Sequence, residues 1–333
     1  MFLLLSYLLL PFVGFIAPYT ATERNAEHLY APPQSVSFMH DGKFIGPHIY
    51  ETVAKMDLVT FQWVYEQDPT KPAMLEFFCE GGEYRIFGFF KTTRHLFCAP
   101  GDSTIFLFGA DRLGRDVFSR ILYGAQLSLT VGLIGICVSF FLGIGFGSIA
   151  GYFGGRADWT INRLIEILRS LPELPLWLAL SAAVPSHWGP VAVFFIISLI
   201  LGLLDWPGLA RAVRAKFLSL REEEYVQAAE MMGAKPSRII GRHMLPNFSS
   251  HLIASAMLSI PAMILGETAL SFLGLGLRAP AVSWGVMLND AQNLAAIEIY
   301  PWTAIPMLPI MLVVLAFNFL GDGLRDSLDP YQT

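Results

Sequence analysis

The stretch that decides the fold runs from Arg221 to Asn247 and reads REEEYVQAAEMMGAKPSRIIGRHMLPN. It is a charged segment of helix-forming residues, and long apolar segments flank it on both sides. Ser219 and Glu222 have the spacing of a capping box, so we expect a helix to start there. Gly233 suits the left-handed residue that ends a helix, and Pro236 suits the start of a second one. A helix–glycine–helix element between two membrane spans is shaped to dock into a soluble partner.

The first helix of this element is expected to cover Ser219–Met232. A wheel with 3.6 residues per turn predicts that it is amphipathic. One face carries Tyr225, Ala228, Ala229 and Met232, and the other carries Glu223, Gln227 and Glu230.

The composition indicates a polytopic membrane protein. Hydrophobic residues make up 54% of the chain and charged residues only 15%, with a mean hydropathy of +0.52. A soluble domain of this length needs far more charged surface. The chain lacks the Walker A pattern GxxxxGK[ST], so we do not expect it to bind ATP by itself.

Six membrane spans are predicted, because a transmembrane helix needs about 20 mostly apolar residues. Their expected positions are 1–18, Ile121–Gly151, Asn162–Val184, Val191–Ala210, a span after Pro246 that includes Ile260–Leu275, and Pro301–Leu320. The first span has no positively charged n-region, so it does not read as a signal peptide. Either the chain begins late or this span is short at its inner end.

The orientation follows from the Lys and Arg residues of the short loops, which favour the cytoplasmic side. The 211–242 segment carries seven of the 22 basic residues, whereas the Pro185–Pro190 turn has none and Gly276–Tyr300 has only Arg278. The charged loop and both termini are therefore expected in the cytoplasm.

A large insert is predicted outside the cytoplasm, at residues 19–120 between the first two spans. It is rich in aromatic residues and has strand-like pieces such as Glu83–Phe90. Cys79 and Cys98 share this insert, so they either pair in an oxidising compartment or remain two free thiols. Residues 121–322 are expected to form a five-helix core with the charged loop at 211–246, followed by a cytoplasmic tail at 323–333.

Gly143, Gly147 and Gly151 recur every four residues on one helix face. A nucleotide-binding glycine loop requires a preceding strand, and here the glycines end a membrane span. Close helix packing is the better interpretation.

No catalytic or metal-binding constellation is predicted. His243 and His251 flank Pro246 without an HExxH pattern or paired carboxylates, so a metalloprotease site lacks a ligand and a base. We find no nucleophile–base arrangement either, and the chain is expected not to be an enzyme.

Glu267 is the acidic residue for which the sequence offers no basic partner in its span. Acids inside a membrane are costly, so we expect Glu267 to face the bundle interior or to line a translocation path. The alternative is a packing carboxylate bonded to Ser or Thr across a helix interface. The charged run Asp111–Asp116 is also ambiguous, because it reads either as self-paired surface charge or as a specific contact.

The loop resembles a known signature. Gln227-Ala228-Ala229, then Gly233, then Leu245-Pro246 look like the EAA loop of ABC-importer permeases, and most resemble the C-type subunit of dipeptide and oligopeptide importers. Similar stretches of that subfamily are Gly109–Leu129, Gly266–Leu277 and Asn318–Pro330. The likeness runs from about Phe108 to Pro330. Gln227 stands where the signature has Glu, which keeps the hydrogen bonding but drops a charge.

The resemblance implies the fold class, which is an all-α polytopic membrane protein with a type I ABC importer transmembrane domain of six helices. It implies a permease of the bacterial inner membrane that moves peptides and docks onto its ATPase. The docking residues carried over are Glu224, Gln227, Ala228, Ala229, Gly233, Ala234, Leu245 and Pro246. For Asp111–Asp116 it raises the possibility of an outer-gate brace or of a contact with a binding protein.

The implied partners are a second permease in a heterodimer, two ATPase subunits, an extracytoplasmic solute-binding protein and membrane lipid, without nucleic acid. The chain itself is expected to bind no cofactor, while ATP and Mg bind the ATPase partner. Two alternatives stay open at this point. One is an ion-driven secondary transporter, although the two halves show no repeat. The other is an ABC importer for a nickel chelate, a sugar or an opine.

Overall fold

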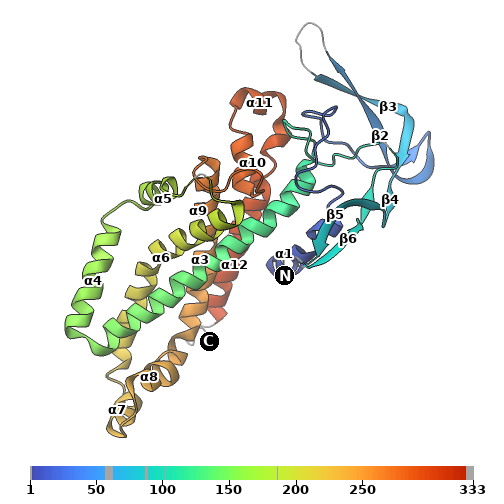
Figure 1. Ribbon diagram of the computed structural model, residues 1–333. Coiled ribbons are helices and arrows are strands. Elements are labelled where there is room, and N and C mark those ends of the chain that lie inside the picture. The colour runs from blue at the N-terminus through green and yellow to red at the C-terminus, as the bar shows by residue number, and fades with distance from the viewer. Residues whose placement is uncertain (1, 57–62, 87–88, 102, 186, 328–333) are drawn as a thin grey trace. The chain divides into compact units, whose positions relative to one another are not determined.

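The structure is a computed structural model that describes residues 2–56, 63–86, 89–101, 103–185 and 187–327 (Figure 1). The chain divides into two compact units. Unit 1 comprises Met1–Ser128 and Leu277–Met311, and unit 2 comprises Leu129–Gly276 and Leu312–Thr333. Helices α3 (Val117–Phe153) and α12 (Met307–Ser327) contribute residues to both units.

The insert of unit 1 folds into antiparallel β-structure. Strands β1 (Ser37–His40), β2 (Lys43–Met56) and β3 (Trp63–Met74) form a three-stranded sheet in the order β1-β2-β3. Two ribbons accompany it, one of β4 (Glu76–Phe77) with β7 (Phe97–Cys98) and one of β5 (Glu80–Ile86) with β6 (Phe90–Arg94). The strand-like piece expected at Glu83–Phe90 belongs to this last ribbon. It is not one strand, because the chain reverses between Ile86 and Phe90 to pair β5 with β6, and residues 87–88 lie outside the described chain.

The first apolar segment is shorter than predicted. It consists of α1 (Phe2–Leu9), the turn η1 (Leu10–Phe12) and α2 (Val13–Ile16), and it ends at Ala17. The helical run Leu3–Ile16 is apolar but falls below the length needed to cross a membrane unaided. The predicted span 1–18 is therefore present as a short helix.

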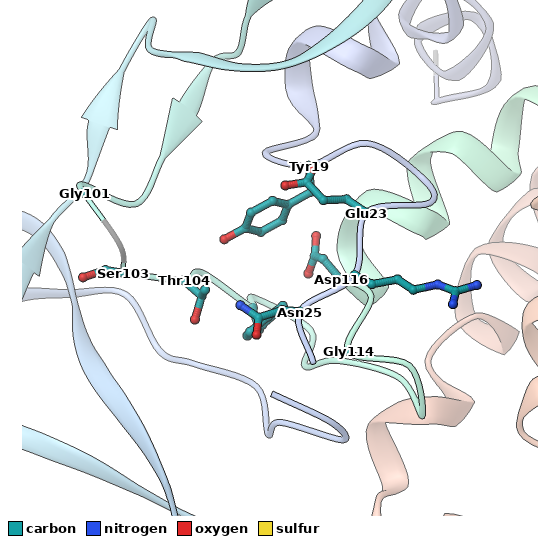
Figure 2. Close-up of a pocket in the computed structure, with 10 residues that line it drawn as sticks. Tyr19, Glu23, Asn25, Gly101, Ser103, Thr104, Gly114 and Asp116 are labelled. Atoms are coloured by element: carbon teal, nitrogen blue, oxygen red, sulfur yellow. The ribbon is translucent and has the colours of Figure 1, made fainter. Parts of the chain in front are cut away.

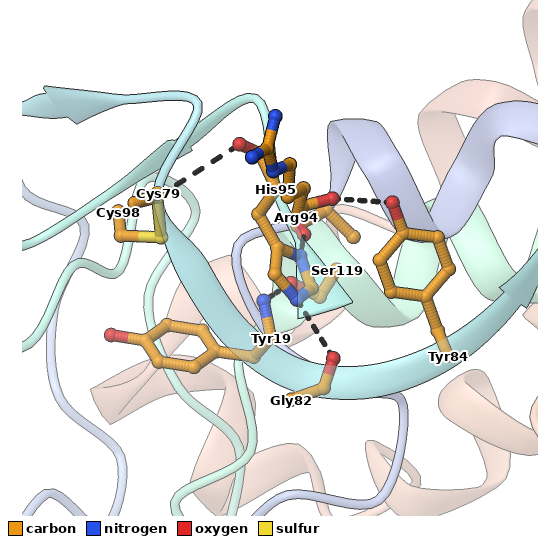
Figure 3. Close-up of a disulfide and its surroundings, with 9 residues drawn as sticks. Tyr19, Cys79, Gly82, Tyr84, Arg94, His95, Cys98 and Ser119 are labelled. Carbon is orange, nitrogen blue, oxygen red and sulfur yellow. Dashed lines mark hydrogen bonds between the residues drawn. A yellow bond between two sulfur atoms is a disulfide. The ribbon is translucent and has the colours of Figure 1, made fainter. Parts of the chain in front are cut away.

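His95 and a disulfide hold the insert together around the end of that helix (Figure 3). The buried His95 ring has Nδ1 2.6 Å from the Ala17 carbonyl oxygen and Nε2 3.0 Å from that of Gly82. Cys79 and Cys98 form a disulfide with their Cα atoms 6.2 Å apart. The sequence left open whether these two cysteines pair or remain free thiols, and in the structure they pair.

The end of the insert leads into α3 at Val117, four residues before the predicted boundary at Ile121. Unit 1 is completed by α10 (Trp284–Asp290), α11 (Leu294–Ile299) and η4 (Pro301–Ala304). Trp284 anchors α10 on α3, because its indole N–H donates to the Ile121 carbonyl at 3.0 Å and its backbone N–H to Ser128 Oγ at 3.2 Å.

Unit 2 is helical throughout its described residues. Its further elements are α4 (Gly155–Arg169), α5 (Glu173–Ala182), α6 (Pro190–Leu220), α7 (Glu224–Met231), α8 (Pro236–Arg238), η2 (Ile239–Met244), η3 (Pro246–Phe248) and α9 (Ser249–Phe272). Four described helical runs are long and apolar enough to cross a membrane: Val117–Phe153, Pro190–Leu220, Pro236–Phe272 and Pro301–Leu324. The helical membrane fold is confirmed, but the count of six spans is not. Residues 328–333 of the predicted tail lie outside the described chain.

The predicted span Asn162–Val184 is wrong as a single helix. The chain forms α4 up to Arg169, then turns, and restarts as α5 at Glu173 with Pro172 in an extended conformation at its N-cap. Proline has no N–H to donate and disfavours helical geometry in the residue before it, which is Leu171. The break therefore follows from the Leu171-Pro172 pair.

The glycine stripe of α3 lies directly against α6, as the sequence predicted. A methyl group added to Gly147 would lie 2.6 Å from the Ala210 carbonyl oxygen, and one added to Gly143 would lie 2.9 Å from the Leu209 side chain. At Gly151 the same group would meet Phe217 at 2.5 Å. Contacts this close leave no room for a side chain at these three positions, so the glycines allow α3 and α6 to pack closely.

We expect the disulfide to stabilise the insert. It closes a loop between residues 19 apart, and a loop of that size is worth about 3 kcal/mol in chain entropy. The double variant Cys79→Ser with Cys98→Ser should lower the thermal unfolding temperature of the insert and speed its proteolysis. Cys137→Ser, which removes an exposed free thiol, is the control and should leave both unchanged. Equal unfolding temperatures for the two variants would contradict this role.

Candidate functional site

The docking loop begins later than the sequence suggested. Helix α6 runs through Ser219 to Leu220, and α7 starts only at Glu224 with Glu223 as its extended N-cap. The predicted capping box of Ser219 and Glu222 is therefore wrong. Helix α6 extends past Ser219, so Ser219 does not cap α7. The residue that stands at the N-cap of α7, Glu223, makes no side-chain hydrogen bond.

The inward face of α7 is narrower than the wheel predicted. Val226 and Ala229 are its buried residues and pack against a cluster at the end of α6 and the start of the next helical run. The other buried members of this cluster are Val213, Phe217, Leu220, Ile239, Met244 and Phe248. Tyr225 and Met232 lie outside it, and Met232 is 81% exposed. Ala228 is exposed as well, and the buried Val226 was not on the predicted face, so Ala229 alone of the four predicted residues is buried.

Gly233 ends α7 as predicted. It has φ of +77°, a conformation that side chains other than glycine rarely adopt. The Gly233 N–H donates to the Glu230 carbonyl at 2.9 Å, and the Ala234 N–H donates to the Ala229 carbonyl at 3.0 Å. No other part of the described chain lies within 4 Å of a methyl group placed on Gly233, so its backbone angle alone requires glycine. Pro236 opens the following helix, also as predicted.

Most of the docking residues carried over from the family signature lie on the exposed side of this loop. Glu224, Gln227, Ala228, Gly233 and Pro246 are exposed, Ala234 and Leu245 are half-buried against the apolar cluster, and Ala229 is buried within it. Met231 is 86% exposed and lies beside this set. The loop thus has a buried side that packs against the apolar cluster and an exposed side that carries both polar and apolar residues.

Gln227 uses its amide in a way that a glutamate could not. Its Nε2 donates a hydrogen bond to the Glu222 carbonyl oxygen at 3.2 Å. A carboxylate has no proton to donate at neutral pH. The departure from the family signature is therefore accommodated by a bond that steadies the turn before α7.

Two polar contacts fix the loop to its surroundings in unit 2. The Tyr152 hydroxyl, at the end of α3, donates to Glu230 Oε1 at 2.8 Å. The Asn247 amide donates to the Tyr225 hydroxyl at 2.7 Å and so joins the two sides of the loop. Figure 1 shows α7 and α8 together at the end of α6. Sequence reasoning missed these contacts, because nothing in the spacing links Tyr152 to Glu230.

Glu267 lies on α9 and is fully buried inside unit 2. The Ser271 hydroxyl, one turn further along the same helix, donates to Glu267 Oε1 at 2.7 Å. The neighbouring residue Gly266 has no side chain, and the side chains of Leu201 and Trp177 occupy the space next to it. Glu267 therefore faces the helix bundle, while its place on a translocation path stays a prediction.

The Asp111–Asp116 run is part of a buried ionic network in unit 1 and is not self-paired surface charge. The Arg115 guanidinium donates to Asp111 Oδ2 at 2.7 Å and to Asp290 Oδ2 at 2.8 Å. Arg120 donates to the same two acids, and its residue exposure is only 2%. The exposed Arg112 completes the set with a 3.1 Å contact to Asp290 Oδ1. Asp290 escaped the sequence analysis, since it lies 170 residues beyond Arg120.

No group of three or more His, Cys, Asp and Glu side chains suited to a metal ion occurs in the described part of the chain.

The sequence matches a known family. Residues 143–332 match the family described as "Binding-protein-dependent transport system inner membrane component". The chain is 43% identical over 231 residues to the dipeptide transport system permease protein DppC of Alkalihalophilus pseudofirmus, covering 69% of this chain and 73% of that protein. It is 40% identical over 233 residues to the oligopeptide transport system permease protein OppC of Haemophilus influenzae, covering 70% and 72% respectively.

Among solved structures, the inward-facing MetNI methionine ABC transporter is similar with a TM-score of 0.49 and 18% sequence identity, covering 63% of this chain and 96% of that chain.

The ionic network yields a prediction that compares two arginines bonded to the same acid. Arg120→Ala should destabilise unit 1 by about 3–5 kcal/mol, because it removes one of the two buried cations that Asp111 and Asp290 share. Arg112→Ala should cost less than about 1 kcal/mol, since an exposed ion pair contributes little. Thermal unfolding of the purified protein would measure both. Similar losses of thermal stability in the two variants would show that burial does not determine how much each ion pair stabilises unit 1.

Proposed function

Because the chain belongs to the family of binding-protein-dependent transport system inner membrane components, we propose that it is the C-type permease subunit of an ATP-driven peptide importer. Its identity of 40–43% to permeases named for dipeptide and oligopeptide transport carries the peptide assignment. That identity extends over more than two-thirds of each relative. Family membership sets aside the ion-driven carrier, and the relatives favour peptides over nickel chelates, sugars and opines.

The chain works as a mechanical part of the transporter and leaves ATP hydrolysis to a separate subunit, which holds ATP and Mg. The exposed side of the loop around α7 docks in a cleft of that ATPase. Its buried side, Val226 and Ala229, packs against residues of α6 and of the run that leads into α9. Packed interiors resist compression, so a displacement of α7 must carry these helices with it. Closing of the ATPases is thereby converted into alternating access.

The complete importer contains a second permease, two ATPase subunits and an extracytoplasmic binding protein in a bacterial inner membrane. Large apolar side chains face outward on α4 and on the segment after it. They support a contact of this region with the membrane or with the second permease. Trp159 is 70% exposed, Ile167 57% and Leu174 55%. Such side chains suit lipid or a second helical subunit and do not suit water.

The docking loop and both termini are placed in the cytoplasm, and the insert of residues 19–116 on the opposite side. The basic residues of the 211–242 segment support this orientation. The disulfide of the insert agrees with it, because disulfides persist in oxidising compartments such as the periplasm.

Replacing Gly233 tests the docking role. Gly233→Val forces a β-branched residue into the left-handed conformation, at a cost of about 1–2 kcal/mol, so the turn after α7 should distort. We expect peptide uptake and transport-coupled ATPase activity to fall while membrane insertion persists. Uptake into vesicles and recovery of the ATPase with the purified permease would measure this.

Gly241→Val is the matched control, because Gly241 has equal open space around it and does not adopt a positive φ. It should have a much smaller effect on uptake. The docking role is wrong if Gly233→Val transports normally and still recovers its ATPase.

The topology yields a separate prediction. Single cysteines at Ser237 and Asn293, in a background without Cys79, Cys98 and Cys137, should react with a membrane-impermeant reagent from opposite sides. Both positions are exposed, so a lack of labelling reports the membrane barrier. Labelling of both from outside intact cells would overturn the proposed orientation.

Glu267 is proposed to line or close the translocation path, and three substitutions separate that role from packing. Glu267→Leu should strongly lower uptake with assembly intact, and Glu267→Gln should lie between it and the parent. Ser271→Ala removes the observed donor but keeps the carboxylate, so it should retain uptake. Uptake and complex recovery are measured side by side. If Glu267→Leu leaves uptake unchanged, or if both Glu267 variants lose the complex, Glu267 is not a path residue.

A further inference from the structure

A polar cavity lies in unit 1, beside the start of α3. Its volume is about 220 Å³, and its lining comes from three separate stretches of chain around residues 19–25, 101–106 and 114–116. Figure 2 shows Tyr19, Asn25, Thr104 and Asp116 arranged around it. Gly114 and Asp116 of this lining belong to the charged run Asp111–Asp116, but the proposed coupling mechanism does not use the cavity.

Asp116 is the unusual member of the lining. Its residue exposure is 3%, and its carboxylate points into the space between Tyr19 and Asn25 (Figure 2). One oxygen, Oδ2, caps the start of α3 by accepting from the Ser119 N–H at 2.7 Å and from the Ser119 hydroxyl at 2.6 Å. The other oxygen, Oδ1, has no hydrogen-bond partner in the described chain. A buried carboxylate oxygen left without a partner is costly, so the cavity is matched to a ligand that donates hydrogen bonds.

Further acceptors lie around the same space. The Tyr19 hydroxyl accepts the Ile105 N–H at 2.8 Å and retains a second lone pair. Glu23 supplies a second carboxylate, bonded through Oε2 to Thr20. The exposed Arg24 is the cation of the lining, so the acids outnumber it. An arrangement of two carboxylates and a hydroxyl suits a group with several donors and one positive charge.

We propose that this cavity binds a primary ammonium group, with Asp116 as the central acceptor and the Tyr19 hydroxyl and Glu23 as secondary ones. An ammonium offers three donors and no acceptor, which complements this lining. The group comes either from the amino terminus of a peptide or from a lysine side chain of a docked protein. The inference holds independently of the docking loop and of which solute is carried.

The charge state of Asp116 supplies a pH dependence. Burial, and to a smaller extent the charge of Asp111, raises the pKa of Asp116 to about 7, while the bonds from Ser119 act in the opposite direction. Only the deprotonated carboxylate pairs with an ammonium. Affinity should therefore be high at pH 8 and fall as pH drops through 7. The His28 ring lies 3.4 Å from Thr104 Oγ1, beside the same lining.

The test measures dissociation constants of small probes for the assembled importer by saturation-transfer NMR. N-acetyl-lysine amide presents only a side-chain ammonium, and N-acetyl-norleucine amide is its neutral match. Alanyl-alanine amide presents an amino terminus, and its N-acetyl form is the neutral match. At pH 8 at least one ammonium probe should bind more tightly than its neutral match. A preference for the lysine probe identifies a protein side chain as the source, and a preference for the dipeptide identifies a peptide terminus.

Asp116→Asn should weaken the preferred probe roughly tenfold, because it replaces a charge-assisted hydrogen bond by a neutral one. Asparagine caps a helix as well as aspartate does, so the start of α3 is preserved. Glu27→Gln, an exposed acid outside the lining, is the matched control and should bind as the parent does. The lysine amide stays charged from pH 6 to pH 8, so its affinity for the parent should fall roughly tenfold when the pH is lowered from 8 to 6. This fall should vanish in Asp116→Asn.

Ser103→Leu narrows the cavity without touching the helix cap, and it should also weaken the ammonium probes. If Asp116→Asn does not fold, the binding of the ammonium probes to Ser103→Leu tests the proposal in its place. Equal binding of charged and neutral probes overturns the proposal. So does unchanged binding in a folded Asp116→Asn protein, or in Ser103→Leu if the first variant does not fold.

Discussion

The close approach of α3 and α6 is the contact on which the arrangement of unit 2 depends. Lipid is as apolar as a leucine side chain, so two membrane helices gain little from the hydrophobic effect and associate through close packing. Gly143, Gly147 and Gly151 provide that contact, because each lies where a methyl group would collide with α6. The contact extends to Phe217 near the end of α6. It therefore sets the position of the apolar cluster on which α7 rests.

Polar interactions then determine how the docking loop is held. α7 is short and lacks a capping side chain, so it has little stability of its own. Its geometry comes from the buried Val226 and Ala229, from the Tyr152–Glu230 bond and from the left-handed turn at Gly233. This division suits a part that transmits force. The buried side packs against α6 and the run that leads into α9, and the exposed side carries polar and apolar residues.

Unit 1 uses buried charge for a structural purpose. Asp111, Arg115, Arg120 and Asp290 compensate one another in a desolvated network, which joins residues before and within α3 to the end of α10. Asp116, the residue immediately before α3, is only half satisfied by comparison, because its Oδ1 has no hydrogen-bond partner in the described chain. The contrast within one short stretch of sequence distinguishes acids that brace the fold from an acid with free capacity to bind a ligand.

Part of the site could be predicted from the sequence because the relevant constraints are local. The positive φ at Gly233, the helix start at Pro236 and the stripe of glycines each follow from the chemistry of a residue and its near neighbours. The capping box at Ser219 failed because packing of α6 against its neighbours outweighed a local signal worth about 1 kcal/mol. Which face of α7 turns inward, Val226 and Ala229, also depends on packing against the apolar cluster.

By itself, the sequence determined the membrane class and the family and located the loop that we propose docks, since apolar length, charge placement and a short signature are properties of consecutive residues. The tertiary structure alone decided which distant groups meet. Arg120 reaches Asp290 across 170 residues, the thiols of Cys79 and Cys98 pair, and Asp116 is buried beside a cavity. The physical reason is that burial and partner choice depend on how the whole chain packs, and a residue's neighbours in sequence do not specify that packing.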